Sequence, residues 1–184
     1  MRIFLDFEAS SLGKNSYPIE AGWAGEDGST ESHLICPAPG WFDWDPTAEA
    51  VHRIARAQLV AEGEPHRQVA RRVLEALKAH EVFVSAPSWD GNWMSVLLRA
   101  GGIPRHALKL RDSDEAFREA AVEGLRGRIP GDRLGGLSLW LIAEARRRAA
   151  PGPAAHRALA DATAELETWR EVQQLAVTFG DPSA

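Results

Sequence analysis

The spacing of hydrophobic residues changes once along this chain. As far as Cys36, apolar and β-favouring residues form short runs that are separated by serine, proline and glycine. These runs predict strands over residues 2–7, 18–24 and 29–36, with a hairpin loop at residues 25–28. Because the three strands follow one another directly, we expect an antiparallel meander at the start of the fold.

Beyond Pro37, the apolar residues mostly recur at helical spacing. The pattern predicts helices over residues 47–56, 65–79, 90–100, 134–149 and 154–177, and a further helix capped by Ser113 or Asp114. Two strands interrupt this part, at residues 81–86 and 107–111, and the first is apolar enough to be buried on both faces of a parallel sheet. We therefore predict an α/β fold: a central mixed five-stranded sheet, with three antiparallel strands and then parallel strands, flanked by helices.

The composition is that of a globular protein, with 45% hydrophobic and 26% charged residues among 184. We expect a single domain at residues 1–178 and a short C-terminal tail at 179–184. The one cysteine, Cys36, cannot form an internal disulfide, which suits a reducing compartment. No apolar run reaches membrane-spanning length, so we expect a cytoplasmic protein with no membrane partner.

The net charge of −5 narrows the function classes. It argues against a protein that coats nucleic acid by charge alone. It leaves room for an enzyme that binds one chain end locally, because an acidic metal site itself contributes to this balance. The positions of the acidic residues are therefore the main guide to function in this sequence.

Two carboxylates stand at the end of the first predicted strand. Asp6 and Glu8 are two residues apart, so both point to one face of that strand. Like charges this close repel one another and raise one pKa unless a cation lies between them. Hard oxygen ligands of this kind hold Mg²⁺ or Mn²⁺. The alternative is a solvent-exposed strand end where both acids are merely hydrated.

Further polar residues occur near the ends of later elements. Asp90 follows an apolar strand, which is where α/β sheets place their sites, although aspartate is also a common helix N-cap. His156 precedes Asp161 by five residues, which on a straight helix sets the two side chains about 140° apart. We therefore expect His156 in a loop or first turn and Asp161 inside the helix, with both converging on one pocket.

These residues together resemble a known family. The first motif is Asp6-Phe-Glu8-Ala-Ser-Ser-Leu12, the last is His156-Arg-Ala-Leu-Ala-Asp161-Ala, and His52-Arg-Ile lies between them. The pattern is similar to that of the DEDDh 3′-to-5′ exonucleases, which include proofreading exonuclease subunits, ribonuclease T and oligoribonuclease. The resemblance covers nearly the whole chain in order, and it implies the ribonuclease H-like fold.

The resemblance implies hydrolysis of phosphodiester bonds from the 3′ end of single-stranded or short RNA or DNA, with release of nucleoside 5′-monophosphates. Asp6, Glu8, Asp90 and Asp161 are the implied ligands of two Mg²⁺ or Mn²⁺ ions, which in such sites lie about 4 Å apart. His156 is the implied general base, because imidazole titrates near neutral pH and is a poor magnesium ligand. Relatives also suggest a possible homodimer.

The family's first motif further implies a wedge between terminal bases at Leu12. We place Ser11, His52, Trp89 and Trp93 in the same substrate-binding set. The indoles of Trp41, Trp44, Trp89 and Trp93 flank the central loop and the Asp90 turn, where they could stack on a base or pack in the core. Trp23, Trp140 and Trp169 lie within predicted elements and are assigned to the core.

The chain departs from the family at four positions. Ala86 and Pro87 stand where many relatives carry His-Asn, and Ala9 and Ser11 replace a common threonine and glycine. None of these replaces an implied metal ligand, but the first two affect the hold on the terminal nucleotide. Two alternatives stay open: a catalytically weak or inactive nucleic-acid-binding module with the same fold, and a partner-binding protein whose acids are surface groups. RNA and DNA are not distinguished by the sequence.

Overall fold

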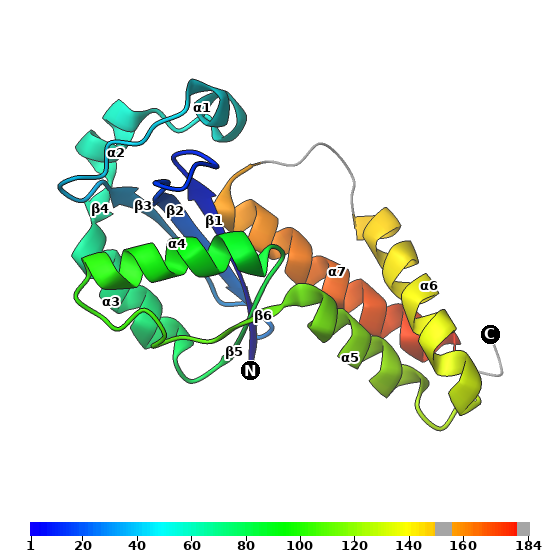
Figure 1. The fold of residues 1–184 in the computed structure, drawn as a ribbon. Helices are drawn as coiled ribbons and strands as arrows, with labels where there is room; N and C mark the ends of the chain where they lie inside the picture. Colours follow the sequence, from blue (N-terminus) through cyan, green and yellow to red (C-terminus); the bar gives the residue numbers. More distant parts are fainter. Residues whose placement is uncertain (150–155, 180–184) are drawn as a thin grey trace.

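The computed structural model describes residues 1–149 and 156–179 (Figure 1). Its strands are β1 (Arg2–Ala9), β2 (Pro18–Gly25), β3 (Thr30–Cys36), β4 (Glu64–Pro65), β5 (Glu81–Val84) and β6 (Leu110–Asp112). They form one six-stranded sheet in the order β4-β3-β2-β1-β5-β6. The predicted tail lies outside the described residues except for Phe179, which ends the last helix.

The sheet is mixed, as the sequence predicts. The pairs β1–β2 and β2–β3 are antiparallel, whereas β5 pairs in parallel with both β1 and β6. The α/β fold class is therefore confirmed. The sheet has one strand more than the five predicted. This extra strand, β4, is a two-residue parallel pairing with the end of β3, and one of its residues, Pro65, was predicted to belong to the following helix.

The helices are α1 (Pro46–His52), α2 (Arg56–Glu62), α3 (His66–Leu77), α4 (Pro87–Ala100), α5 (Ser113–Leu125), α6 (Gly131–Ala149) and α7 (Ala158–Phe179). The predicted helix over residues 47–56 ends earlier, because Arg53 adopts a left-handed conformation with φ 58°. The helix predicted to begin at Asp90 begins three residues sooner, since Pro87 is well suited to a first helical turn. The predicted start at residue 154 falls outside the described residues.

Helices cover both faces of the sheet (Figure 1). Helices α3 and α4 pack on one face against the odd-numbered residues of β1, such as Ile3 and Leu5. Helices α5 and α7 pack on the other, where Phe4 of β1 meets Phe117 and Trp169, and α6 packs on the outside of this pair. Because side chains alternate along a strand, the even-numbered residues of β1 face α7.

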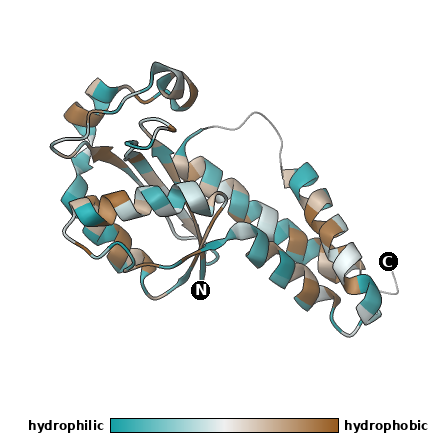
Figure 2. Ribbon diagram, in the orientation of Figure 1, coloured by the Kyte–Doolittle hydropathy of each residue, from teal (hydrophilic) through white to brown (hydrophobic). Residues whose placement is uncertain are grey.

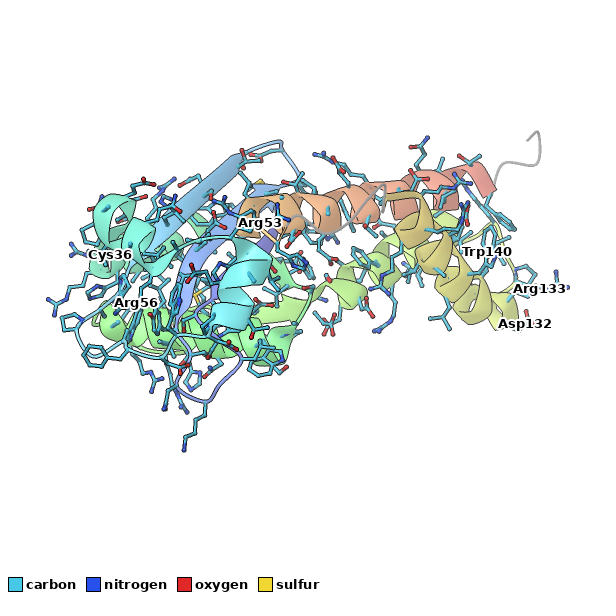
Figure 3. The ribbon with its side chains drawn as sticks, turned by 90° about the horizontal axis from the view of Figure 1, so that it is seen from above. Cys36, Arg53, Arg56, Asp132, Arg133 and Trp140 are labelled. Atoms are coloured by element: carbon cyan, nitrogen blue, oxygen red, sulfur yellow. The ribbon has the colours of Figure 1, made fainter. Side chains whose placement is uncertain are left out.

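The hydropathy pattern follows these layers, with apolar residues gathered on the helix faces that meet the sheet (Figure 2). Trp23 and Trp169 are buried, as predicted. The assignment of Trp140 to the core is wrong, because its side chain is 52% exposed on the outer helix α6 (Figure 3). It packs there against Phe179 at the end of α7, with 5.9 Å between the ring centroids. Within the described ranges, no helix is long and apolar enough to cross a membrane.

Candidate metal centre

Three carboxylates from the two ends of the chain meet at the carboxyl end of β1. The side chains of Asp6 and Glu8 project from the face of β1 that α7 covers, and Asp161 lies in the first turn of α7. One oxygen from each of the three lies within 4.8 Å of the others. Oxygen donors at this separation match the hard ligand set that Mg²⁺ and Mn²⁺ prefer.

Asp90 lies beside these three, although it does not belong to the set whose oxygens are all within 4.8 Å. It is almost fully buried in the first turn of α4. Its Oδ2 accepts a hydrogen bond from the backbone N–H of Ala86 at 3.2 Å, and the N–H of Phe7 on β1 also hydrogen-bonds to its carboxylate. Asp90 is therefore held against β1, and its charge acts on Asp6 and Glu8.

The carboxylates of this group disfavour one another's ionisation. Burial and the charges of Asp90 and Glu8 raise the pKa of Asp6 well above its usual value. Burial, followed by the charges of Asp161 and Glu20, raises the pKa of Glu8 to about 7. Burial raises the pKa of Asp90 to about 7 as well. A bound divalent cation would relieve this repulsion, so the donor set fits the metal that the sequence implies.

Glu20 is a functional residue that the sequence analysis missed. It lies directly opposite Glu8 across the β1–β2 pair, and it is 1% exposed. Its carboxylate accepts two hydrogen bonds from the guanidinium of Arg157, at 3.0 and 2.6 Å, and one from the N–H of Ala158 at 3.0 Å. Glu20 therefore fixes the N-terminus of α7 to the sheet. An acid within an otherwise apolar strand is the sequence signal that could have revealed it.

Gly22 completes this docking site for α7. A Cβ added to it would lie 2.2 Å from the backbone nitrogen of Leu159 and 2.5 Å from the carbonyl carbon of Ala158. Only glycine at this position therefore lets the first turn of α7 rest on the backbone of β2. Glu20 and Gly22 are two apart on β2 and face the same side, and together they set where Asp161 lies relative to β1.

His156 lies immediately before α7, as the sequence spacing suggests. It is exposed and has a positive φ of 48°, which turns the chain into the helix. Burial raises the pKa of Asp161, and the nearby imidazole of His156 lowers it. The imidazole therefore acts electrostatically on Asp161, and its exposure leaves it accessible to solvent.

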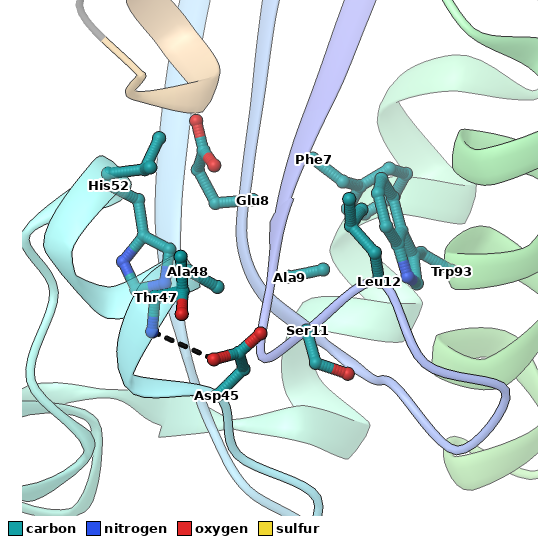
Figure 4. A pocket seen from close by; sticks show the side chains of 11 residues that line it. Phe7, Glu8, Ala9, Ser11, Leu12, Asp45, Thr47, Ala48, His52 and Trp93 are labelled. Atoms are coloured by element: carbon teal, nitrogen blue, oxygen red, sulfur yellow. Dashed lines mark hydrogen bonds between the residues drawn. The ribbon is translucent and has the colours of Figure 1, made fainter.

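An apolar pocket of about 250 Å³ adjoins the carboxylates (Figure 4). Its lining comes from the end of β1 and the segment after it, from α1 and from α4, and it includes Glu8, Leu12, Val51 and Trp93. Asp45 caps α1 at the rim by accepting a hydrogen bond from the N–H of Thr47 at 2.8 Å. Because Glu8 belongs both to the pocket and to the carboxylate group, a ligand in the pocket reaches the candidate metal site.

Four of the five predicted substrate-binding residues line this pocket: Ser11, Leu12, His52 and Trp93. The side chain of Leu12 is 70% exposed at its mouth. Trp89 is not part of the lining, but its ring stacks on that of Trp93 with 5.7 Å between centroids. His52 is 3% exposed, and its Nδ1 accepts a hydrogen bond from the N–H of Ile54 at 3.0 Å, so it forms part of the pocket wall.

The other two candidate stacking tryptophans pack against protein side chains. Trp41 stacks on Tyr17 with 5.0 Å between the ring centroids. Trp44 meets the edge of His52, and its indole N–H donates to Glu49 at 2.7 Å. These contacts support the loop over residues 37–45 that leads into α1.

Comparison with known proteins relates this fold to exonucleases of solved structure. No protein-family model matches the chain, and no curated protein matches its sequence. A zinc-bound complex of E. coli exonuclease I with single-stranded DNA is similar in structure, with a TM-score of 0.66 and 18% identity over 94% of this chain and 40% of that one. E. coli exonuclease I with a dA16 oligonucleotide gives a TM-score of 0.64 and 16% identity over 97% and 42%. The chain thus spans about two fifths of these exonucleases and shares their ribonuclease H-like α/β fold.

Proposed function

We propose that this chain is a metal-dependent 3′-to-5′ exonuclease that acts on single-stranded or short nucleic acid and releases nucleoside 5′-monophosphates. The observation that carries the proposal is the convergence of Asp6, Glu8 and Asp161 within 4.8 Å, next to a pocket open to a chain end. The shared fold of an exonuclease crystallised with single-stranded DNA supports it. Zinc in that complex is consistent with a divalent-metal site in this fold.

Asp6, Glu8, Asp90 and Asp161 would hold a pair of Mg²⁺ or Mn²⁺ ions. When bound, such ions stabilise the negative charge that develops on the phosphate and on the leaving oxygen. The chain's own contribution is to hold the four carboxylates close together. The backbone N–H groups that hold Asp90 and the contacts of Glu20 with the start of α7 provide this positioning.

His156 is the general base of this proposal. Its imidazole takes the proton of the attacking water as the new bond to phosphorus forms. Because His156 is exposed, it can then pass that proton to solvent. The carboxylates hold the metal, and the histidine moves the proton.

The apolar pocket receives the terminal nucleotide. Leu12 at its mouth is placed to enter between the last two bases, and Trp93, backed by Trp89, offers an aromatic surface to the terminal base. Ala86 and Pro87 before Asp90 provide no side-chain hydrogen-bond donor, so apolar contact has the larger share in holding the nucleotide.

Labelled oligonucleotides test this function directly. RNA and DNA carrying a 3′ or a 5′ label are incubated with the protein in Mn²⁺, Mg²⁺ or EDTA, and the products are separated by size. We expect mononucleotides to leave from the 3′ end only when metal is present. Asp6→Asn should slow this release by about 10⁴-fold, because metal ions contribute several kcal/mol to the barrier. Asp132→Asn, which removes an exposed charge at the far end of α6 (Figure 3), is the matched control.

The replacement of His-Asn by Ala86 and Pro87 favours one second candidate, a binding module that kept the fold and lost turnover. The same assay separates the two. Retention of single strands without release of any mononucleotide in Mn²⁺ would support the binding module and contradict the exonuclease.

A further inference from the structure

Helix α7 presents a second carboxylate on the side that carries Asp161. Glu165 lies one turn after Asp161, and residues four apart on a helix share a face. Its Oε2 is buried and has no hydrogen-bond partner among the residues that the structure describes. A buried carboxylate oxygen without a partner costs free energy of folding, so a cation or a hydrogen-bond donor from outside the chain would stabilise this atom.

The surroundings of Glu165 do not neutralise it. The Ser113 hydroxyl at the start of α5 favours the ionised form of Glu165, while Asp112 and Asp114 oppose its ionisation. Arg146 on α6 favours the ionised form, but its guanidinium is bound to Asp114 in a salt bridge. Burial remains the dominant influence and raises the pKa of Glu165.

The charge of Glu165 acts on the candidate metal centre. It raises the pKa of both Asp6 and Asp90, which come from β1 and α4. Glu165 is nevertheless outside the set of carboxylates whose oxygens lie within 4.8 Å of one another. It therefore lies outside the converged ligands but within electrostatic reach of Asp6 and Asp90.

We propose that Glu165 is a fifth acid of the metal centre, a positioning residue that strengthens the capture of a divalent cation by Asp6 and Asp90. This inference depends on the metal site of the proposed function. A fifth negative charge in a poorly solvated site raises cation affinity without an added ligand bond. The same charge destabilises the metal-free protein, because Ser113 and Arg146 offset only part of the cost of burying it. Glu165 is thus expected to cost stability in EDTA and to favour folding in Mn²⁺.

Two readouts that do not depend on turnover test this. Mn²⁺ affinity is measured by titration calorimetry, and thermal unfolding is followed in EDTA. Glu165→Gln keeps the size of the side chain and removes its charge, Glu165→Leu fills similar space without a polar group, and Glu165→Asp retains the charge. Glu167→Gln is the matched control, because Glu167 lies on the same helix and is exposed.

We expect Glu165→Gln to weaken Mn²⁺ binding by about tenfold and to raise the unfolding temperature in EDTA. Glu165→Leu should weaken binding to a similar extent, and it decides the test if the glutamine variant does not fold. Glu165→Asp should restore most of the affinity, and Glu167→Gln should leave it unchanged. Unchanged Mn²⁺ affinity in both uncharged variants, or a lower unfolding temperature in EDTA for both, would overturn the proposal and leave Glu165 as a structural partner of Ser113.

The outcomes also separate this inference from the proposed function. Wild-type protein that degrades oligonucleotides while Glu165→Gln binds Mn²⁺ normally contradicts only the role of Glu165. Wild-type protein that binds Mn²⁺ in a Glu165-dependent way but releases no nucleotide contradicts only the exonuclease.

Discussion

Two groups of carboxylates in this molecule have opposite electrostatic surroundings. One surrounds Arg111 at the end of the sheet, where Glu81, Glu115 and Glu119 all pair with a single guanidinium. Hydrogen bonding to Arg111 holds the pKa of Glu119 below its usual value. Each of these acids therefore has a cationic partner within the chain itself.

The other group is the candidate metal centre. The charges that act most strongly on Asp6 are all carboxylates, and they raise its pKa together with burial. Arg157, which partly offsets the charge on Glu8, is bound by Glu20. The contrast teaches that a count of acids does not identify a metal site. What distinguishes the candidate centre is that the chain gives its acids little cationic compensation, which supports the proposal of a cation bound from solution.

The largest effect expected from a change outside the carboxylates separates the chemistry of the centre from its charge. His156→Ala should slow mononucleotide release by about 10²- to 10⁴-fold, the usual contribution of general base catalysis. Mn²⁺ affinity should change little, since the carboxylates remain. Single-turnover kinetics and calorimetric titration measure the two quantities. His106→Ala, at an exposed position, is the control. A large loss of Mn²⁺ binding in His156→Ala would instead place the imidazole among the ligands.

A second prediction concerns the position of α7, the helix that carries Asp161. Gly22→Ala forces a methyl group into the backbone of α7 at Leu159 and should destabilise the protein by about 1–3 kcal/mol. Because α7 carries Asp161, Mn²⁺ affinity should fall as well. Denaturant unfolding and metal titration measure both effects. Gly136→Ala in α6, where a Cβ meets nothing within 4 Å, should be neutral or slightly stabilising. Normal Mn²⁺ affinity in Gly22→Ala would mean that the position of α7 does not control the site.

Sequence periodicity was sufficient for the fold class and for much of the centre. Asp6 and Glu8 share a face because of strand alternation alone, whereas the expectation that Asp161 joins them came from the resemblance to the exonuclease family. Glu20 and Gly22 could not be assigned in the same way. Their roles depend on the register between β1 and β2 and on where α7 meets β2, two long-range features that local spacing does not encode.

Two further residues illustrate the same limit. Glu165 has an ordinary sequence context for a helix surface, and only the packing of α7 near Ser113 leaves it half-buried, with its Oε2 enclosed. Trp140 was misassigned because a tryptophan within a helix usually packs inward, whereas α6 forms an outer layer and leaves it half exposed. In both cases the deciding information is which helix covers which surface.

The smallest expected effect is a difference between the two groups of acids in how protein stability changes with pH. In metal-free protein the pKa of Glu8 is raised from 4.5 to about 7, so the folded state binds its proton more tightly than the unfolded state does. The stability that this contributes is complete below the unfolded pKa and is lost as pH rises through about 7. Glu119 behaves in the opposite way, because its lowered pKa gives stability that is lost only as pH falls through the folded value.

We therefore expect Glu8→Gln to become progressively more stable than wild type in EDTA between about pH 5 and pH 8, by on the order of 1 kcal/mol or about 2–4 °C. Glu119→Gln should show no such trend over that range. The quantity to compare is the difference in stability between each variant and wild type. Burial lowers the pKa of His52 and of His66, and this gives the stability of the whole protein a pH dependence of the opposite sign. Saturating Mn²⁺ should reverse the advantage of Glu8→Gln at the higher pH, since the metal requires the ionised carboxylate. Equal pH trends for the two variants in EDTA would show that the two groups of acids do not differ in compensation, and the argument for a metal at β1 would lose its electrostatic basis.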